Sequence, residues 1–193
     1  MSTLKVDTIL SADTPTVNFT DGLNVSGIVT ATSVTATTYT GITTTALPAG
    51  TVLQAVSATT TTTTSNTTTT FADTGLTASI TISANSKVLI MCTQHLDVQR
   101  SATASRCAIK LLRGSTDIFA PANSKNVGME GHYDSTQMVL FLPLHFSFLD
   151  TGASTGSNTY KIQGKVTSSS GSPRVRFQDD SNPSTMTLLE IAG

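Results

Sequence analysis

Between residue 71 and the end of the chain, several stretches alternate apolar and polar residues one by one, and this period of two constrains the fold most strongly. Ala78, Ile80 and Ile82, for example, alternate with hydroxyl residues. Successive side chains of a β-strand point to opposite faces, so the pattern predicts half-buried strands. The apolar members of the other stretches are Val88, Ile90, Cys92, Leu96, Val98, Cys107, Ile109, Leu111, Tyr160, Ile162, Val166, Val175 and Phe177. About eight short strands separated by turns are typical of a β-sandwich or barrel.

Residues 138–149 form the most apolar of these stretches. Its apolar parity consists of Met138, Leu140, Leu142, Leu144, Phe146 and Phe148. We expect this strand to provide the most apolar face of the domain. Together with a strand at residues 87–98, it is long enough to cross a jelly roll. The sequence therefore predicts an all-β, jelly-roll-like β-sandwich at residues 50–193.

The first 49 residues have a different character. Apolar residues occur singly there, separated by Thr, Ser and Gly, and the triplet Thr-Ala-Thr recurs at Thr30 and Thr35. The period is still that of a strand, but large side chains are too few to bury a core. Such a segment needs neighbours, which repeat architectures and intertwined oligomers supply. We predict an extended β-arm or short intertwined shaft at residues 1–49, followed by the sandwich.

Threonine and serine account for 38 and 23 of the 193 residues. The bias is strongest at residues 59–70, where only Ser65 and Asn66 interrupt a run of threonines. Threonine is β-branched and favours strands. This tract is expected to be a solvated strand with a turn at Ser65-Asn66; the alternative is a flexible linker.

The charge content argues against several classes of protein. Charged residues make up 12% of the chain and the formal net charge is −1, so no electrostatic footprint for nucleic acid is visible. The sequence has no apolar run of about 18 residues, so membrane insertion is not expected. Residues 1–7 lack a basic region followed by an apolar one, so no signal peptide is expected.

Neither the cysteines nor the histidines form a recognisable metal motif. Cys92 and Cys107 are not part of a C-x-x-C pair, and both are expected to be small buried apolar residues. His95, His132 and His145 could meet at a metal or around a trimer axis, but their spacing favours surface or interface positions. We expect no cofactor and no catalytic or metal-binding residues.

Three further patterns have simpler explanations than a site. Residues 179–182 (DDSN) resemble part of a calcium loop but lack its glycine and distal glutamate. Residues 152–156 (GASTG) match the G-x-S-x-G pattern of serine hydrolases, yet they fall between two predicted strands and no histidine follows them, which favours a turn. A solvated sheet face, which could attract an anionic glycan, is expected to carry Lys161, Lys165, Arg174 and Arg176.

Several segments resemble tail-fibre-like virion proteins of marine bacteriophages, especially cyanophages. They are residues 1–9 (MSTLKVDTI), 47–54 (LPAGTVLQ), 86–90 (SKVLI), 112–116 (LRGST), 146–150 (FSFLD), 160–163 (YKIQ) and 187–193 (TLLEIAG). Their order and spacing cover essentially the whole chain. A minor departure is Asp150-Thr151-Gly152, where family members often have Asp-x-Pro.

The resemblance implies a homotrimeric tail fibre or spike of the virion, made in the cytoplasm of the bacterial host. Its N-terminus would dock to other tail or neck proteins, and its C-terminal domain would contact a host surface glycan or outer-membrane protein. The candidate attachment residues are Leu4, Val6, Ile9, Val17 and Phe19. Rigid scaffolds usually bind through their loops. The candidate receptor-contact residues are Asn123, Lys125, Asn126, His132 and Tyr133, in a long loop at residues 120–135; residues 168–173 could equally form the tip.

Two alternatives to this function remain. The first is a capsid or neck fibre, or decoration protein, with a purely structural role. The second is a glycan-cleaving enzyme, which would need paired carboxylates in a groove, for which Asp97 and Glu130 would be the residues to test. The acidic residues are few and fall mostly in turns, so we do not expect an enzyme.

Overall fold

The computed structural model describes residues 47–100, 104–120, 128–132 and 138–193. Within these ranges the chain is all-β, as predicted, and contains no α-helix. Membrane-spanning helices are not found among the described residues. The strands are β1 (Val52–Thr60), β2 (Thr64–Asn66), β3 (Ala72–Ile82), β4 (Lys87–Arg100), β5 (Ala104–Arg113), β6 (Thr116–Phe119), β7 (Gly128–His132), β8 (Met138–Asp150), β9 (Gly156–Val166), β10 (Arg174–Phe177) and β11 (Ser184–Ile191). A 3₁₀ turn, η2 (Asp179–Ser181), separates β10 from β11.

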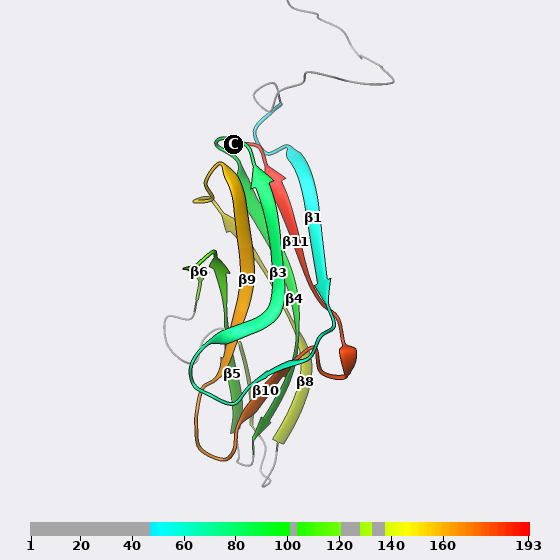
Figure 1. The fold of residues 1–193 in the computed structure, drawn as a ribbon, viewed down its shortest axis with the longest axis vertical. Helices are drawn as coiled ribbons and strands as arrows, with labels where there is room; N and C mark the ends of the chain where they lie inside the picture. The colour runs from blue at the N-terminus through cyan, green and yellow to red at the C-terminus, as the bar shows by residue number, and fades with distance from the viewer. Residues whose placement is uncertain (1–46, 101–103, 121–127, 133–137) are drawn as a thin grey trace, which may run out of the picture. The chain divides into compact units, whose positions relative to one another are not determined.

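The strands form two antiparallel sheets that pack face to face (Figure 1). Sheet A contains β1, β2, β4, β8, β10 and β11, and sheet B contains β3, β5, β6, β7 and β9. In sheet A, β4 pairs with β8 along one edge and with β11 and then β10 along the other. In sheet B, β5 pairs with β9 along one edge and with β6 and β7 along the other. The predicted β-sandwich is therefore confirmed.

The strand pairs are nested around the β5–β6 hairpin. The strands that flank this hairpin in the sequence pair next, β4 with β8, and the strands before and after those, β3 and β9, pair with each other. The outermost pairs join β1 to β11 and β2 to β10. All of these nested pairs are antiparallel.

The core lies between the sheets and contains the residues that the alternation predicted. The largest side chains that are fully buried include Tyr160, Phe177, Ile90, Leu111 and Ile162. Cys92 and Cys107 are both buried and form no disulfide, which confirms their predicted character. They come from different sheets, because Cys92 lies on β4 and Cys107 on β5.

Strand β8 is less buried than its sequence predicts. Leu144, Phe146 and Phe148 are only half-buried, and Leu142 is exposed. β8 lies at the edge of sheet A and pairs, within the described residues, with β4 alone. The fully buried core residues come instead from β3, β4, β5, β9, β10 and β11, while Leu144, Phe146 and Phe148 pack against the margin of this core.

The threonine tract does not turn at Ser65-Asn66, as the sequence predicted. Ser65 and Asn66 belong to β2, which pairs with β10, and the chain changes strand at residues 61–63 instead. Asn66 is buried, and its amide Nδ2 donates to Thr70 O (2.8 Å) and Gly164 O (2.9 Å). The tract is held to sheet B through Asn66, so it is not a flexible linker.

The outer faces of the two sheets differ in charge. On sheet A, three consecutive cross-strand rows, here called the uncharged rows, contain no Lys, Arg, Asp or Glu. The rows are Ala55, Leu189, Leu89 and Leu149; Ser57, Thr187, Met91 and Ser147; and Thr59, Thr185, Thr93 and His145. On sheet B, the outer face includes Asp73, Lys110, Asp117 and Lys161.

Both ends of the described chain lie at one end of the sandwich (Figure 1). Gly50 N donates to Ala192 O, and Ala192 N donates to Thr51 O, each at 2.9 Å. At the opposite end lie residues 67–71 and 167–173, which we call the loop end. The predicted arm lies almost entirely outside the described residues, so the division at residue 49 stays a prediction.

Candidate functional site

An open hollow at the loop end is the best candidate for a binding site. Its volume is about 450 Å³. The residues that line it are Thr67, Gln99, Ser169, Ser172, Pro173 and Arg174. They come from the segment after β2, the end of β4 and the connection from β9 to β10. Hydroxyl, amide and guanidinium groups therefore meet at one place although their residues are far apart in the sequence.

Local backbone geometry holds the walls of this hollow. On one side, Asn66 Oδ1 accepts hydrogen bonds from Thr68 N (2.8 Å) and Thr68 Oγ1 (2.9 Å), which fixes the turn that carries Thr67. On the other side, Gly171 and Ser172 have φ of 75° and 47°. This left-handed backbone allows the chain to reverse tightly before β10.

A cluster of charged groups lies beside the hollow on β4, β10 and η2. Arg176 Nη1 donates to both carboxylate oxygens of Asp179 at 2.9 Å. Asp97 Oδ2 lies 3.6 Å from Arg174 Nη2 and 3.9 Å from Arg176 Nη1. Arg174 also donates to Gln99 Oε1 in the wall of the hollow. The cluster therefore positions the guanidinium of Arg174 at the rim.

Asp97 is the most unusual member of this cluster. Only 1% of the residue is exposed. Burial is the main cause that raises the pKa of Asp97 above its usual range; the carboxylate of Asp179 adds to this, while Arg174 and Arg176 oppose it. Because Asp97 is buried beside two arginines, it cannot reach a substrate in the hollow. The groups at the surface of the hollow are suited to hydrogen bonding with a polyol or sugar rather than to acid–base chemistry.

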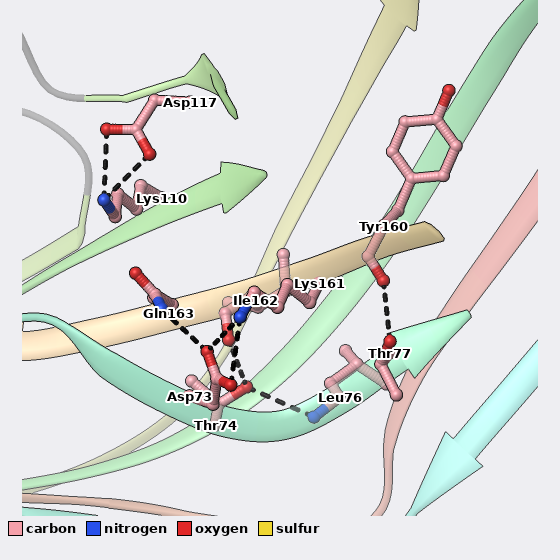
Figure 2. A network of polar contacts seen from close by, with 10 residues as sticks. All are labelled: Asp73, Thr74, Leu76, Thr77, Lys110, Asp117, Tyr160, Lys161, Ile162 and Gln163. Atoms are coloured by element: carbon pink, nitrogen blue, oxygen red, sulfur yellow. Dashed lines mark hydrogen bonds and ion pairs between the residues drawn. The ribbon is translucent and has the colours of Figure 1, made fainter. Parts of the chain in front are cut away.

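The four basic residues predicted to share one face are divided between the two sheets. Arg174 and Arg176 lie on sheet A, whereas Lys161 and Lys165 lie on sheet B. Figure 2 shows Lys161 beside Asp73, with Nζ 3.0 Å from Oδ1. The ammonium of Lys165 lies 4.6 Å from the centre of the Phe71 ring. The four residues therefore do not share one sheet face.

The other predicted contact and attachment residues lie mostly outside the described ranges. This holds for Leu4, Val6, Ile9, Val17, Phe19, Asn123, Lys125, Asn126 and Tyr133. The backbone of His132 is described: it is the last residue of β7 and pairs with Ala104, at the loop end. Part of the long loop predicted at residues 120–135 is thus the edge strand β7.

Two of the histidines and the two short motifs lie in strands and turns of the sandwich. His95 and His145 lie on the outer face of sheet A, as their parity predicts, and Thr93 Oγ1 lies 2.9 Å from His145 Nδ1. No group of three metal-ligating side chains occurs in the described part of the chain. Residues 152–155 form the turn between β8 and β9. In η2, the carboxylate of Asp179 forms an ion pair with Arg176.

Two residues of the hollow were missed at the sequence level, namely Thr67 and Gln99. Thr67 was hidden within the threonine tract, where nothing distinguishes one hydroxyl from another. Gln99 has the same parity on its strand as His95 and Asp97, so the alternation could have predicted that it lies on the outer face of the sheet. Its proximity to residues 168–173 depends on the pairing of β4 with β10, which the sequence does not encode locally.

No protein-family model matches the chain, and no curated protein sequence matches it.

Proposed function

We propose that this chain is a structural protein of a bacteriophage virion, a homotrimeric tail fibre or spike that attaches the particle to the host surface. One observation carries the proposal. The described chain enters and leaves the sandwich at one end, and the polar hollow lies at the opposite end. A domain built in this way can be mounted through residues 1–49 while its loop end stays accessible.

We assign the sandwich to the jelly-roll class. The nested pairing of β4 with β8, β3 with β9 and the outermost strands supports this assignment, because a jelly roll is a long antiparallel hairpin wrapped into two sheets. Capsid and lectin domains use this architecture. It suits both parts of the proposal, a virion subunit and a binding domain.

The proposed ligand of the hollow is a host surface glycan. The hydroxyls of Thr67, Ser169 and Ser172 and the groups of Gln99 and Arg174 offer both donors and acceptors, which match the hydroxyls of a sugar. An open hollow on a rigid scaffold suits a repeating polymer better than a small metabolite, which is normally enclosed.

The experiment is to measure the binding of the labelled full chain to marine cyanobacterial cells and to an array of their surface polysaccharides. Ser169 is exposed in the wall of the hollow, so Ser169→Trp fills the space without removing a charged group. We expect this variant to bind at least about tenfold more weakly than the wild type, because a loss of 1.4 kcal/mol has that effect.

The matched control is Thr159→Trp, at an exposed position of β9 on the outer face of sheet B. It is expected to bind like the wild type. Binding of the Ser169→Trp variant with unchanged affinity would remove the hollow as the receptor site. Absence of binding to every cell and glycan tested would contradict the attachment role and favour a capsid or neck decoration protein.

A further inference from the structure

The outer face of sheet A exposes large apolar side chains that a solvated sheet face would not need. Met91 on β4 is 41% exposed, and Leu149 on β8 is 46% exposed. Phe141, which is 54% exposed, lies further along β8 in the row of Asp97, outside the uncharged rows. Leu89 and Leu189 lie beside Leu149 in the first of the uncharged rows. Monomeric soluble proteins seldom expose contiguous apolar patches of this kind, and such patches mark interaction surfaces.

The edge of the same sheet lacks the charges that usually protect an edge strand, although β8 contains Pro143, which cannot donate a backbone hydrogen bond. Strand β8 runs over Met138–Asp150 and pairs on one side with β4; its other edge has no partner strand among the described residues. Long apolar edge strands usually carry charges or are covered by another element, because unpaired backbone groups attract other strands. Between Val139 and Leu149, β8 has no charged residue.

Sheet B shows what the solvated face of this sandwich looks like. There Lys110 Nζ lies 2.8 Å from Asp117 Oδ1, and Gln163 Nε2 donates to Asp73 Oδ1 at 2.7 Å (Figure 2). The ion pairs Lys110–Asp117 and Lys161–Asp73 lie at this surface, and the side chains of both carboxylates are exposed. The uncharged rows of sheet A contain hydroxyl and imidazole groups but no residue that could form such an ion pair at neutral pH.

We propose that the uncharged rows of sheet A and the free edge of β8 form the interface with further copies of this chain. The inference rests on the proposed homotrimer and specifies which face of the sandwich lies inside it. Sheet B, with its ion pairs, then forms the outer surface of the fibre head.

The absence of charge favours a copy of the chain over a foreign partner. Selective recognition between different proteins usually depends on complementary charges, which the uncharged rows cannot supply. Two copies of an uncharged face can approach without like-charge repulsion and without removing charged groups from water, whereas two copies of the sheet B face would have to desolvate the Lys and Asp side chains that form its ion pairs. Interfaces of obligate homo-oligomers are also more apolar than those of transient complexes.

The first test is the mass of the full chain in solution, measured by size-exclusion chromatography with light scattering. Met91→Lys places a charge in the centre of the uncharged rows. An unpaired buried charge weakens association strongly, so we expect the concentration of half-dissociation to rise by about a hundredfold. Met91→Leu should keep the wild-type mass. The matched control is Ser79→Lys, an exposed mid-strand position on sheet B, which should also keep it.

The second test does not require a disruptive substitution. Met91→Cys and Ser79→Cys place a thiol on each face, while Cys92 and Cys107 are buried. In the assembled protein we expect the thiol at position 91 to react with a maleimide at least about tenfold more slowly than the thiol at position 79. Protection of position 91 should disappear on dilution into the monomer range.

The outcomes separate this inference from the proposed function. A trimeric wild type in which Met91→Lys stays trimeric, or in which positions 91 and 79 react equally fast, would overturn the interface and leave the trimer in place. A monomeric wild type would overturn both.

Discussion

Arg113 Nη1 donates two hydrogen bonds to the carboxylate of Asp150, at 2.8 Å and 2.6 Å, and this ion pair joins the end of β5 in sheet B to the end of β8 in sheet A. The hydroxyl of Tyr160 donates to Asp150 Oδ2 at 2.9 Å, and Gly152 N donates to Oδ1 at 2.9 Å. Asp150 therefore links the two sheets and the turn between β8 and β9. Burial, followed by the hydrogen bond to Asp150, raises the pKa of Tyr160.

Asp150→Ala should lower the free energy of unfolding by about 3 kcal/mol, because it leaves Arg113 and the buried hydroxyl of Tyr160 without their acceptor. Urea denaturation at one fixed protein concentration measures the change. The matched control is Asp117→Ala, which removes the exposed partner of Lys110 and should change stability by less than about 0.5 kcal/mol. Equal effects of the two variants would mean that Asp150 is not a structural link.

Gly164 lies on β9 directly under the ring of Phe177. A β-carbon at Gly164 would be 2.9 Å from Phe177 Cε1 and closer still to Cζ, so there is no room for one. We expect Gly164→Ala to destabilise the fold by about 1–3 kcal/mol, as overpacked cores do. Phe177→Leu combined with Gly164→Ala should recover part of this loss, since the smaller side chain frees the space.

The control for this prediction is Gly152→Ala. A β-carbon there would meet its nearest atom, Arg113 Nη1, at 3.5 Å, which is an ordinary contact. Its thermal unfolding midpoint should stay close to that of the wild type. If Gly164→Ala also unfolds at the wild-type temperature, the packing of Phe177 against β9 is looser than described.

Asp97 and Glu190 should respond to acid in opposite directions. Burial raises the pKa of Asp97, so its charge destabilises the fold at neutral pH, and this penalty disappears as the pH falls through the raised pKa. The free energy of unfolding of Asp97→Asn, compared with that of the wild type at the same pH, should therefore be higher at pH 7 than near pH 4. Denaturant titrations at the two pH values measure this difference.

Glu190 provides the matched comparison. Burial opposes its ionisation, but hydrogen bonds from Gln54, Ser83 and Ser86 outweigh this and lower its pKa. Gln54 Nε2 and Ser83 N both donate to it at 2.6 Å. A lowered pKa gives stability that is present above the usual value of 4.5 and is lost as the pH falls through the folded value. Glu190→Gln should cost about 1–2 kcal/mol at pH 7 and less in acid. The same pH trend in both variants would contradict this assignment.

The two native cysteines should be unreactive in the folded chain. Burial raises the pKa of the Cys92 thiol to about 12, and Cys107 is buried in the opposite sheet. Because the thiolate is the reactive form, Ellman's reagent should label almost no thiol in native buffer and both thiols in denaturant. Rapid labelling of one thiol in the native protein would show that the core opens at that strand.

The alternation predicted the inward-facing residues of β3, β4, β5, β9 and β10 because each of these strands has one buried face. It did not predict that the apolar side chains of β8 are only half-buried, since two strands with the same side chains look alike in sequence wherever they lie in a sheet. The apolar residues on both parities of residues 138–149 were a usable signal, because a strand with one buried and one solvated face keeps its alternation.

The site was harder to predict than the fold. Arg174 was identified as an outward-facing residue, but its association with Gln99 and Thr67 depends on contacts between segments far apart in the chain. Asn66 was assigned to a turn because asparagine favours turns, whereas here its side chain forms the turn at Thr68 while its backbone stays in β2. Long-range pairing, which periodicity cannot show, decided both cases.

The central claim, a homotrimeric attachment fibre, is tested most directly by the molar mass of the full chain in solution. Light scattering at micromolar concentration should give about three times the 20.1 kDa of one chain. A single species at 20.1 kDa that stays monomeric as the concentration rises would contradict the account.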